Sequence, residues 1–337
     1  MNTVSVAISG FGTVGQGVAE VLIRRKDFLA ARYGSEPKVV CIMDSKTVAR
    51  DPEGLDLGKI LERKKNTRTV GDETYTDSRA VLGSAEYDLL IEVTPTDIKT
   101  GGVGLVNITY ALECGKDVIT VNKGPLALEF SKLIGLARKN GCKFRFEGTV
   151  GGAMPIINLC HENLVGEKIR SVRGIFNGTC NYILSKMDKG QPYEQALKEA
   201  QQLGYAETDP TNDVEGYDTA AKCVIIANSV FHRDVSFKDV KITGISRITA
   251  DAVAQAASHN MVIRLIGEVS DTVLEVSPRL IPVGHPLGIS GTLNIAQIDA
   301  DLAGPITING RGAGRIETAS AILSDLIAIL DERYGHA

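Results

Sequence analysis

Short apolar runs alternate with amphipathic segments along the first 150 residues of the chain. The runs are rich in Val, Ile and Leu and have the length of buried parallel strands. They cover residues 4–8, 39–43, 89–93, 117–121 and 143–146. Between them, apolar residues recur at helical spacing after residue 15, near 57–65, over 106–113 and over 128–140. This alternation predicts an α/β domain with a doubly wound parallel sheet.

The pattern changes after residue 150. Helices are expected over 155–163, 180–187, 193–203 and 213–230, and strands of alternating polarity over 168–176, 262–270 and 272–281. This pattern predicts an α+β domain with an open, mainly antiparallel sheet. A last helix, 317–333, is expected to pack back on the first domain. We therefore expect one domain over 1–150, completed by 310–337, and a second domain over 151–309.

A glycine-rich turn joins the first strand to the first helix: Gly10-Phe11-Gly12-Thr13-Val14-Gly15. Gly10 permits the tight turn, Gly12 lets the backbone approach a pyrophosphate, and Gly15 allows the helix to pack on the sheet. The amides at the helix start, with the helix dipole, favour phosphates. Because the motif follows a strand and opens a helix, it predicts a Rossmann-type domain that binds NAD or NADP.

The end of the second strand bears on the choice between these two cofactors. Asp44 stands where a carboxylate accepts hydrogen bonds from a ribose 2′-hydroxyl, which favours NAD. Lys46 and Arg50 follow closely and would pair with the 2′-phosphate of NADP. The sequence leaves both cofactors open.

Two further turns are expected at the carboxyl ends of the strands, where ligands bind in doubly wound sheets. They are Thr94-Pro95-Thr96 and Asn122-Lys123-Gly124-Pro125. The Lys123 amine would stand between cofactor and substrate, although a solvated loop lysine fits the local sequence equally well.

The densest polar stretch of the second domain runs from Glu207 to Lys222 and leads into an otherwise apolar helix. Asp218 and Lys222 are four residues apart and share a helix face. The simplest interpretation is a surface ion pair. A lysine on a largely buried helix can instead have a lowered pKa and serve in general acid/base catalysis. The carboxylates of Glu207 and Asp213 would suit a substrate ammonium group.

Composition narrows the classes of function. The chain has 337 residues, 43% hydrophobic residues and a net charge of −4, so nucleic acid and anionic membranes are not expected as partners. No signal peptide, apolar run of membrane-spanning length, or metal-ligand spacing among six cysteines and five histidines is found. Reduced thiols fit a cytoplasmic protein.

Longer segments make the chain resemble the homoserine dehydrogenases from Val6 to Leu326. Besides the glycine turn, the matching segments are 122–127, 147–152, 177–184, 204–222 and 312–325. The resemblance implies reversible reduction of L-aspartate 4-semialdehyde to L-homoserine with NADH or NADPH, on the route to threonine and methionine. It also implies a homodimer formed through the substrate-binding domain.

Residue roles follow from the same resemblance. Lys222 matches the acid/base lysine and Asp218 its nearby carboxylate, while Glu207 and Asp213 match substrate-binding acids. Lys123 matches an active-site lysine on the cofactor side, and Thr94 and Gly314 match cofactor contacts. A monovalent cation, Na⁺ or K⁺, is implied at Glu147 with the backbone of Val150, Gly152 and Met154.

Departures from the family pattern are small. Glu317 stands where a proline is expected, and the chain ends at Ala337 where many relatives continue into a regulatory domain, so feedback inhibition through such a domain is not expected. Two other readings compete with this one. A semialdehyde dehydrogenase that forms a thioester would need an activated cysteine such as Cys180 with a nearby histidine. A non-catalytic NAD(H)-sensing protein would need an effector or DNA-binding element.

Overall fold

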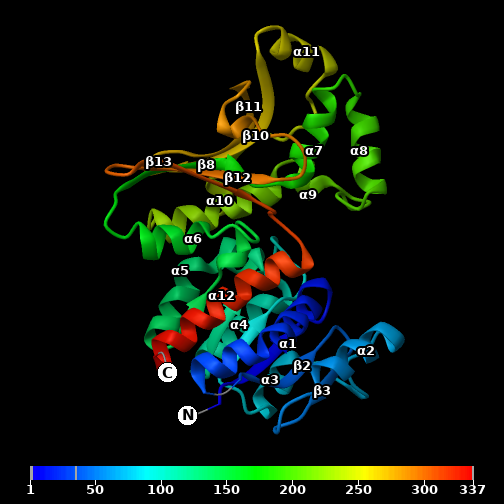
Figure 1. Ribbon diagram of the computed structural model, residues 1–337, viewed down its shortest axis with the longest axis vertical. Coiled ribbons are helices and arrows are strands. Elements are labelled where there is room, and N and C mark those ends of the chain that lie inside the picture. The colour runs from blue at the N-terminus through cyan, green and yellow to red at the C-terminus, as the bar shows by residue number, and fades with distance from the viewer. Residues whose placement is uncertain (1–2, 35, 336–337) are drawn as a thin grey trace. The chain divides into compact units, whose positions relative to one another are not determined.

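A computed structural model describes residues 3–34 and 36–335. The chain forms two compact units: Met1–Thr149 with Gly314–Ala337, and Val150–Ala313. Figure 1 shows the course of the chain through both units. The first unit is thus discontinuous in sequence, because the last helix of the chain belongs to it.

The described residues of the first unit form a seven-stranded sheet in the order β4-β3-β2-β1-β5-β6-β7. Its strands are β1 (Ser5–Ser9), β2 (Lys38–Met43), β3 (Thr47–Arg50), β4 (Glu73–Thr74), β5 (Leu89–Glu92), β6 (Asp117–Thr120) and β7 (Phe144–Arg145). The predicted parallel sheet is confirmed for β2, β1, β5, β6 and β7. The strands β3 and β4, which the sequence did not predict, extend this sheet antiparallel.

Helices cover both faces of this sheet. They are α1 (Thr13–Tyr33), α2 (Leu57–Thr67), α3 (Ser78–Ser84), α4 (Gly102–Glu113), α5 (Lys123–Lys139) and α12 (Arg315–Tyr334), with the 3-10 turn η1 (Glu147–Thr149). One core joins α1 and α12 to β1, β2 and β5, and the other joins α3, α4 and α5 to the opposite face. Figure 1 shows α1 and α12 side by side. They approach closely because Gly17 has no side chain: a Cβ there would lie 2.3 Å from the Arg315 carbonyl oxygen.

The second unit contains a six-stranded sheet, in the order β13-β12-β8-β10-β11-β9. Its strands are β8 (Ile169–Ile175), β9 (Lys241–Ile242), β10 (Met261–Ser270), β11 (Leu274–Pro282), β12 (Asn294–Ala300) and β13 (Gly304–Gly310). All pairings are antiparallel except that of β9 with β11. The mainly antiparallel sheet is therefore confirmed. The β12–β13 hairpin and the helix α11 (Ala250–Ser258) were not predicted.

The helices of the second unit depart from the predicted bounds in two places. Its helical elements are α6 (Ile156–Asn158), η2 (Leu159–Asn163), α7 (Gly178–Met187), α8 (Tyr193–Gln202), α9 (Thr211–Val214), α10 (Tyr217–Val230), α11, η3 (Phe237–Asp239) and η4 (Pro286–Gly288). The single helix predicted over 213–230 is wrong, because Gly216 has a φ of +83° and separates α9 from α10. The helix predicted over 155–163 is a short α-helical turn followed by a π-helix. No helix among the described residues is long and apolar enough to span a membrane.

Candidate active site

The glycine turn of the first unit has the geometry that its sequence predicts. Gly10 has a φ of +96°, and its N–H donates to the Met43 carbonyl at 2.8 Å. A Cβ on Gly10 would lie 2.6 Å from the Val93 carbonyl oxygen, and one on Gly15 would lie 2.1 Å from the Gly10 carbonyl oxygen. Neither position tolerates a side chain, so these two glycines fix the path of the turn across the ends of β1 and β5.

Gly12 differs from the other two glycines, because a Cβ built on it meets nothing within 4 Å. It caps α1 without a side-chain hydrogen bond, and the first turn of the helix carries no acidic residue. Gln16 donates its side-chain amide to the carbonyls of Phe11 and Gly12. The start of α1 thus has open space beside it, and no acidic side chain of its first turn offsets the positive end of the helix dipole. Both features suit the pyrophosphate of a dinucleotide.

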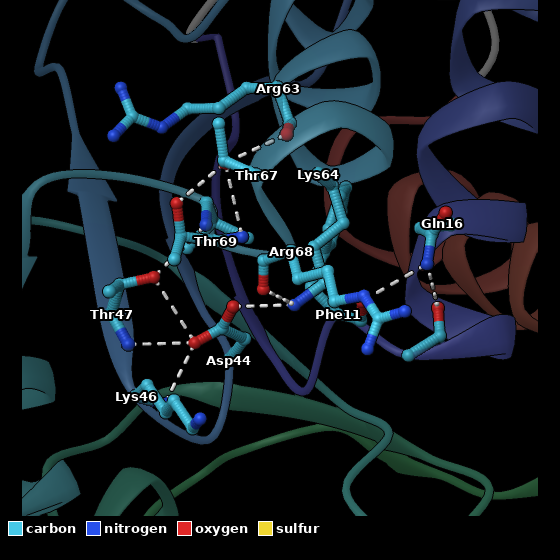
Figure 2. Close-up of polar contacts among 12 residues, drawn as sticks. Phe11, Gln16, Asp44, Lys46, Thr47, Arg63, Lys64, Thr67, Arg68 and Thr69 are labelled. Carbon is cyan, nitrogen blue, oxygen red and sulfur yellow. Dashed lines mark hydrogen bonds and ion pairs between the residues drawn. The ribbon is translucent and has the colours of Figure 1, made fainter.

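Asp44 lies at the end of β2, as predicted, but its carboxylate already has partners (Figure 2). Its Oδ1 accepts from the amides of Lys46 and Thr47 and from the Thr47 hydroxyl, at 2.7–3.2 Å. Its Oδ2 accepts from Lys64 Nζ at 2.6 Å. Burial acts to raise the pKa of Asp44, but the hydrogen bonds from Lys64, Thr47 and Lys46 outweigh it and hold this pKa below its usual value. A ribose hydroxyl would therefore have to compete with partners inside the protein.

No local sequence pattern marks Lys64, in the last turn of α2, because only the fold brings it to Asp44. Its ammonium also donates to the Arg68 carbonyl at 2.9 Å. Arg68 is exposed and has a φ of +61°, and in Figure 2 its side chain extends in the direction of Phe11 and Gln16. Lys46 is exposed beside this group, whereas Arg50 pairs with Glu73 at 2.8 Å. The cations near the end of β2 are therefore Lys46, Lys64 and Arg68.

The turns after β5 and β6 come together at the carboxyl ends of these strands, as predicted. The Asn122 side-chain amide donates to both the carbonyl and the hydroxyl oxygen of Thr94 and to the Pro95 carbonyl, at 3.3 Å each. Asn122 also caps α5, because its Oδ1 accepts from the Gly124 amide. Lys123 is thereby the first residue of a helix and partly buried. The alternative of a solvated loop lysine is therefore wrong.

In the second unit, Lys222 is 6% exposed on α10. Its Nζ donates to Asp218 Oδ2 at 2.7 Å and to the Phe176 carbonyl oxygen at 2.5 Å. The predicted pairing of these residues four apart is confirmed, but the pair is buried rather than on the surface.

Asn177 connects this pair to Asp213. Its side-chain amide donates to Asp213 Oδ1 at 2.7 Å and to Asp218 Oδ2 at 3.0 Å, while its Oδ1 caps α7. The sequence signal for Asn177 was its position before a helix, but its role as a bridge was not predicted. The hydrogen bonds that the structure describes do not extend to Glu207, whose side chain is exposed. The hydrogen-bonded group therefore consists of Asn177, Asp213, Asp218 and Lys222.

Cys180 does not have the properties of a catalytic nucleophile. Its side chain is fully buried, and its thiol donates to the Asp213 carbonyl at 3.1 Å. Burial raises the pKa of this thiol well above its usual value. A thioester-forming enzyme needs the opposite shift.

The residues expected around a monovalent cation fall on both sides of the boundary between the units. Glu147 is 2% exposed in the first unit, and its amide donates to Asp325 Oδ2 at 2.9 Å. Val150, Gly152 and Met154 belong to the second unit, where Gly152 has a φ of +59°. A buried carboxylate such as that of Glu147 suits a hard cation with oxygen ligands. Gly314, a predicted cofactor contact, precedes α12, and a Cβ on it would lie 2.2 Å from Glu317 Oε2.

Comparison with known proteins agrees with this arrangement. Residues 155–327 match the homoserine dehydrogenase family, and residues 10–147 match the NAD-binding domain of homoserine dehydrogenase. A homoserine dehydrogenase from Methanocaldococcus jannaschii is 50% identical over 331 residues, which cover 96% of this chain and 98% of that protein. An NAD(+)-dependent homoserine dehydrogenase from Pseudomonas canavaninivorans is 35% identical, covering 98% of this chain and 97% of that protein.

Solved structures show the same fold. A putative homoserine dehydrogenase from Archaeoglobus fulgidus superimposes with a TM-score of 0.91 at 49% identity, covering 97% of this chain and 99% of that one. A hyperthermophilic archaeal homoserine dehydrogenase in complex with NADPH gives a TM-score of 0.85 at 29% identity, with 97% of each chain covered. The chain belongs to the homoserine dehydrogenase family and is an NAD(P)-dependent oxidoreductase.

Proposed function

We propose that the chain reduces L-aspartate 4-semialdehyde reversibly to L-homoserine, in threonine and methionine biosynthesis, with Lys222 as the proton donor. One observation carries this proposal. Lys222 is a buried ammonium whose two described acceptors are the Asp218 carboxylate and the Phe176 carbonyl. An ammonium has three N–H donors, so one remains for a substrate oxygen.

A nicotinamide cofactor held at the glycine turn would supply a hydride to the aldehyde carbon. The carbonyl oxygen gains the electron pair of the C=O π bond, and Lys222 gives it a proton as the charge develops. In the reverse direction Lys222 accepts the hydroxyl proton of homoserine. Asp218 keeps the lysine in place throughout, because its Oδ2 accepts from both Lys222 and Asn177.

Acidic side chains beside Lys222 would bind the amino group of the substrate. Asp213 faces the same asparagine as Asp218, and its carboxylate is partly exposed. Glu207 would complete this site from the exposed loop before α9. Lys123, Thr94 and Gly314 would contact the cofactor from the first unit, with Lys123 adding positive charge near the reacting atoms.

We further propose that the chain accepts NADP(H) as well as NAD(H). The support is that Asp44, which would select a ribose diol, is paired with Lys64 through Oδ2 and accepts two backbone amides through Oδ1. Lys46 and Arg68 add two exposed cations at the same end of the sheet. A dianionic 2′-phosphate would therefore meet a positive group rather than a free carboxylate.

A monovalent cation, Na⁺ or K⁺, is proposed at Glu147 with the backbone oxygens of Val150, Gly152 and Met154. The support is the burial of Glu147, whose backbone amide donates to the fully buried carboxylate of Asp325. Such a cation would offset negative charge there. Activity measured in a buffer free of Na⁺ and K⁺, and after each is restored, tests this proposal.

A homodimer in the cytoplasm is also proposed. Exposed apolar side chains on the second unit, such as Leu280 at 59% and Leu302 at 80%, support self-association. The six cysteines are all free thiols, which suits a reducing compartment. Light scattering after gel filtration tests the dimer, and cell fractionation tests the location.

An assay of homoserine oxidation with NAD⁺ and NADP⁺ in parallel tests the proposed reaction. Formation of the reduced cofactor that depends on homoserine is expected with both. If neither NAD⁺ nor NADP⁺ supports turnover, the proposed reaction is refuted. Turnover with NAD⁺ alone would refute the proposed cofactor range.

A further inference from the structure

Glu92 is a carboxylic acid buried completely at the carboxyl end of β5. In the sheet it lies in register with Ser9 on β1 and Thr120 on β6. Helical connections leave β1 and β5 in opposite directions along the sheet, so Glu92 stands at the point where the strand order reverses. Ligands of doubly wound sheets bind above this point. The reaction proposed above gives no role to this acid.

Hydrogen bonds connect both carboxylate oxygens to different strands. Glu92 Oε1 accepts from the Thr94 amide at 2.9 Å and from the Thr94 hydroxyl. Glu92 Oε2 accepts from the Thr120 hydroxyl at 3.1 Å. That hydroxyl also accepts from the Asn122 amide at 3.0 Å, so the carboxylate contacts the turn after β5 directly and the turn after β6 through Thr120.

The fold makes room for this group on α4. A Cβ on Gly104 would lie 2.4 Å from Asn122 Nδ2 and 3.2 Å from both carboxylate oxygens of Glu92. Only a glycine at this position lets the helix cover Glu92 and Asn122 together. Burying an acid this deeply is costly, and a structural connection alone could use a neutral amide.

We infer that Glu92 is a positioning residue, which holds Thr94 and the Asn122–Lys123 turn in the arrangement that receives the nicotinamide end of the cofactor. This inference rests on the proposed function, because Thr94 and Lys123 are placed there as cofactor-side residues. Glu92 acts through Thr94 and Asn122 rather than on the reacting atoms.

The ionisation of Glu92 makes this role sensitive to pH. Burial raises the pKa of its carboxyl to about 7, although hydrogen bonds from Thr94, Thr120 and Asn122 lower it. When protonated, the acid must donate a hydrogen bond. The amide groups of Thr94 and Asn122 can only donate to it, so a threonine hydroxyl must rotate and accept. The hydrogen bonds of Thr94 and Thr120, which connect Glu92 to the two turns, therefore change as pH falls through 7.

The described groups that face Glu92 from the surrounding elements are uncharged. They are Ser9 on β1, Thr120 on β6, Gly104 on α4, and Thr94 and Asn122 in the turns. Charged side chains in the same two turns are Asp97, Lys99 and Lys123.

The test compares the full-length enzyme with Glu92→Gln across pH values on both sides of 7. Two quantities are measured: the KM for NADP⁺ in homoserine oxidation, and the Kd for NADPH from its fluorescence, which needs no turnover. In the wild type both should change near pH 7. In Glu92→Gln this change should disappear, while kcat stays within about threefold of the wild type. Glu113→Gln, on the exposed surface of α4, is the matched control and should keep the wild-type profile.

A second variant keeps the inference falsifiable if Glu92→Gln does not fold. Thr120→Val removes one donor to the ionised carboxylate and should move the inflection upward by roughly 0.5–1 pH unit. A wild-type pH profile in folded Glu92→Gln, or no movement in Thr120→Val, would overturn the inference. Failure of the proposed function is a separate result: the wild type would then show no homoserine oxidation, while the NADPH titration still reports on Glu92.

Discussion

Lys222 is held by two acceptors in a site from which solvent is almost excluded. A buried ion pair of this kind seldom adds net stability, because the desolvation of both charges offsets their attraction. The Lys222–Asp218 pair is therefore better explained by chemistry than by stability. The carbonyl of Phe176 orients the ammonium from a second direction, so a longer or shorter cation would not reach the same position.

Replacement of Lys222 by alanine should lower kcat for homoserine oxidation by about 10²–10⁴-fold, the usual contribution of a general acid or base. The Kd for NADPH should stay nearly unchanged, because the glycine turn lies in the other unit. Steady-state kinetics and fluorescence titration measure the two quantities. Lys189→Ala, at an exposed position after α7, serves as the control. Wild-type turnover in Lys222→Ala would refute its role.

Lys64 should determine how well the enzyme accepts NADP(H). In Lys64→Ala, the Asp44 carboxylate loses its cation and repels a 2′-phosphate, so kcat/KM should fall at least about tenfold for NADP⁺. The value for NAD⁺ should change little, because its ribose carries no phosphate. Parallel assays with both cofactors give the ratio. Lys59→Ala, an exposed lysine on α2, should leave this ratio as it is in the wild type. An unchanged ratio in Lys64→Ala would show that the phosphate is bound elsewhere.

Glu92 should also make stability depend on pH. Its pKa is raised in the folded state, so its contribution is present below the ordinary value of 4.5 and lost as pH rises through about 7. As pH rises from 4.5 to about 7, the free energy of unfolding of the wild type should therefore fall relative to that of Glu92→Gln. The expected fall is on the order of 3 kcal/mol. Urea unfolding at a series of pH values measures it, and parallel curves for the two proteins would contradict a raised pKa.

In the turn from β1 to α1, Gly12 should affect cofactor binding, whereas Gly15 should affect the stability of the fold. Gly12→Ala adds a methyl group in open space, so the fold should remain while cofactor affinity falls at least about tenfold, because the pyrophosphate needs that space. Gly15→Ala would press a methyl group onto the Gly10 carbonyl and should lower Tm markedly. Thermal unfolding and NADPH titration of both variants distinguish the two effects. Equal losses of Tm in both would contradict the assignment of Gly12.

The elements that the sequence predicted are those whose signals are local. The parallel strands are continuous apolar runs, and α1 begins at Thr13, inside a glycine motif whose geometry the residues determine. The β12 strand gives a weaker signal because it contains Gln297, which is buried. Its side-chain oxygen accepts two hydrogen bonds from Arg173, 124 residues away. No local pattern reports such a partner.

The residues of the candidate site were likewise predicted where the signal is local and missed where it depends on distant partners. The i, i+4 spacing of Asp218 and Lys222 predicts their pairing, and the strand ends predict that Thr94 and Asn122 meet. The partners of Asp44 could not be predicted, because Lys64 reaches it only through the packing of α2 on the core that α1 and β2 share. Gly216 interrupts the predicted helix over 213–230 because its φ is positive. A glycine permits a positive φ, but its presence in a sequence does not predict one.

At the scale of the whole molecule, the last helix completes the first unit. Ile322, Leu326, Ile329 and Leu330 of α12 lie in one core with β1 and α1. Leu326 is fully buried, so Leu326→Ala should lower the free energy of unfolding of this unit by about 2–5 kcal/mol. Denaturant unfolding followed by the loss of NADPH binding measures this change. Leu203→Ala, in the second unit and 55% exposed, should have little effect. Similar losses in both variants would mean that α12 is not part of this core.

The position of α12 has a consequence for synthesis on the ribosome. Residues 1–149 leave the exit tunnel first, but their core stays open until the whole second unit has been translated. At about 5–20 residues per second this interval lasts roughly ten to thirty seconds. During that time the nascent chain exposes the apolar surface of α1 and β1 that α12 later covers, which makes it a client for chaperones. A chain cut short before α12 would lack a finished nucleotide-binding core, so the capacity to bind cofactor reports that translation has passed α12.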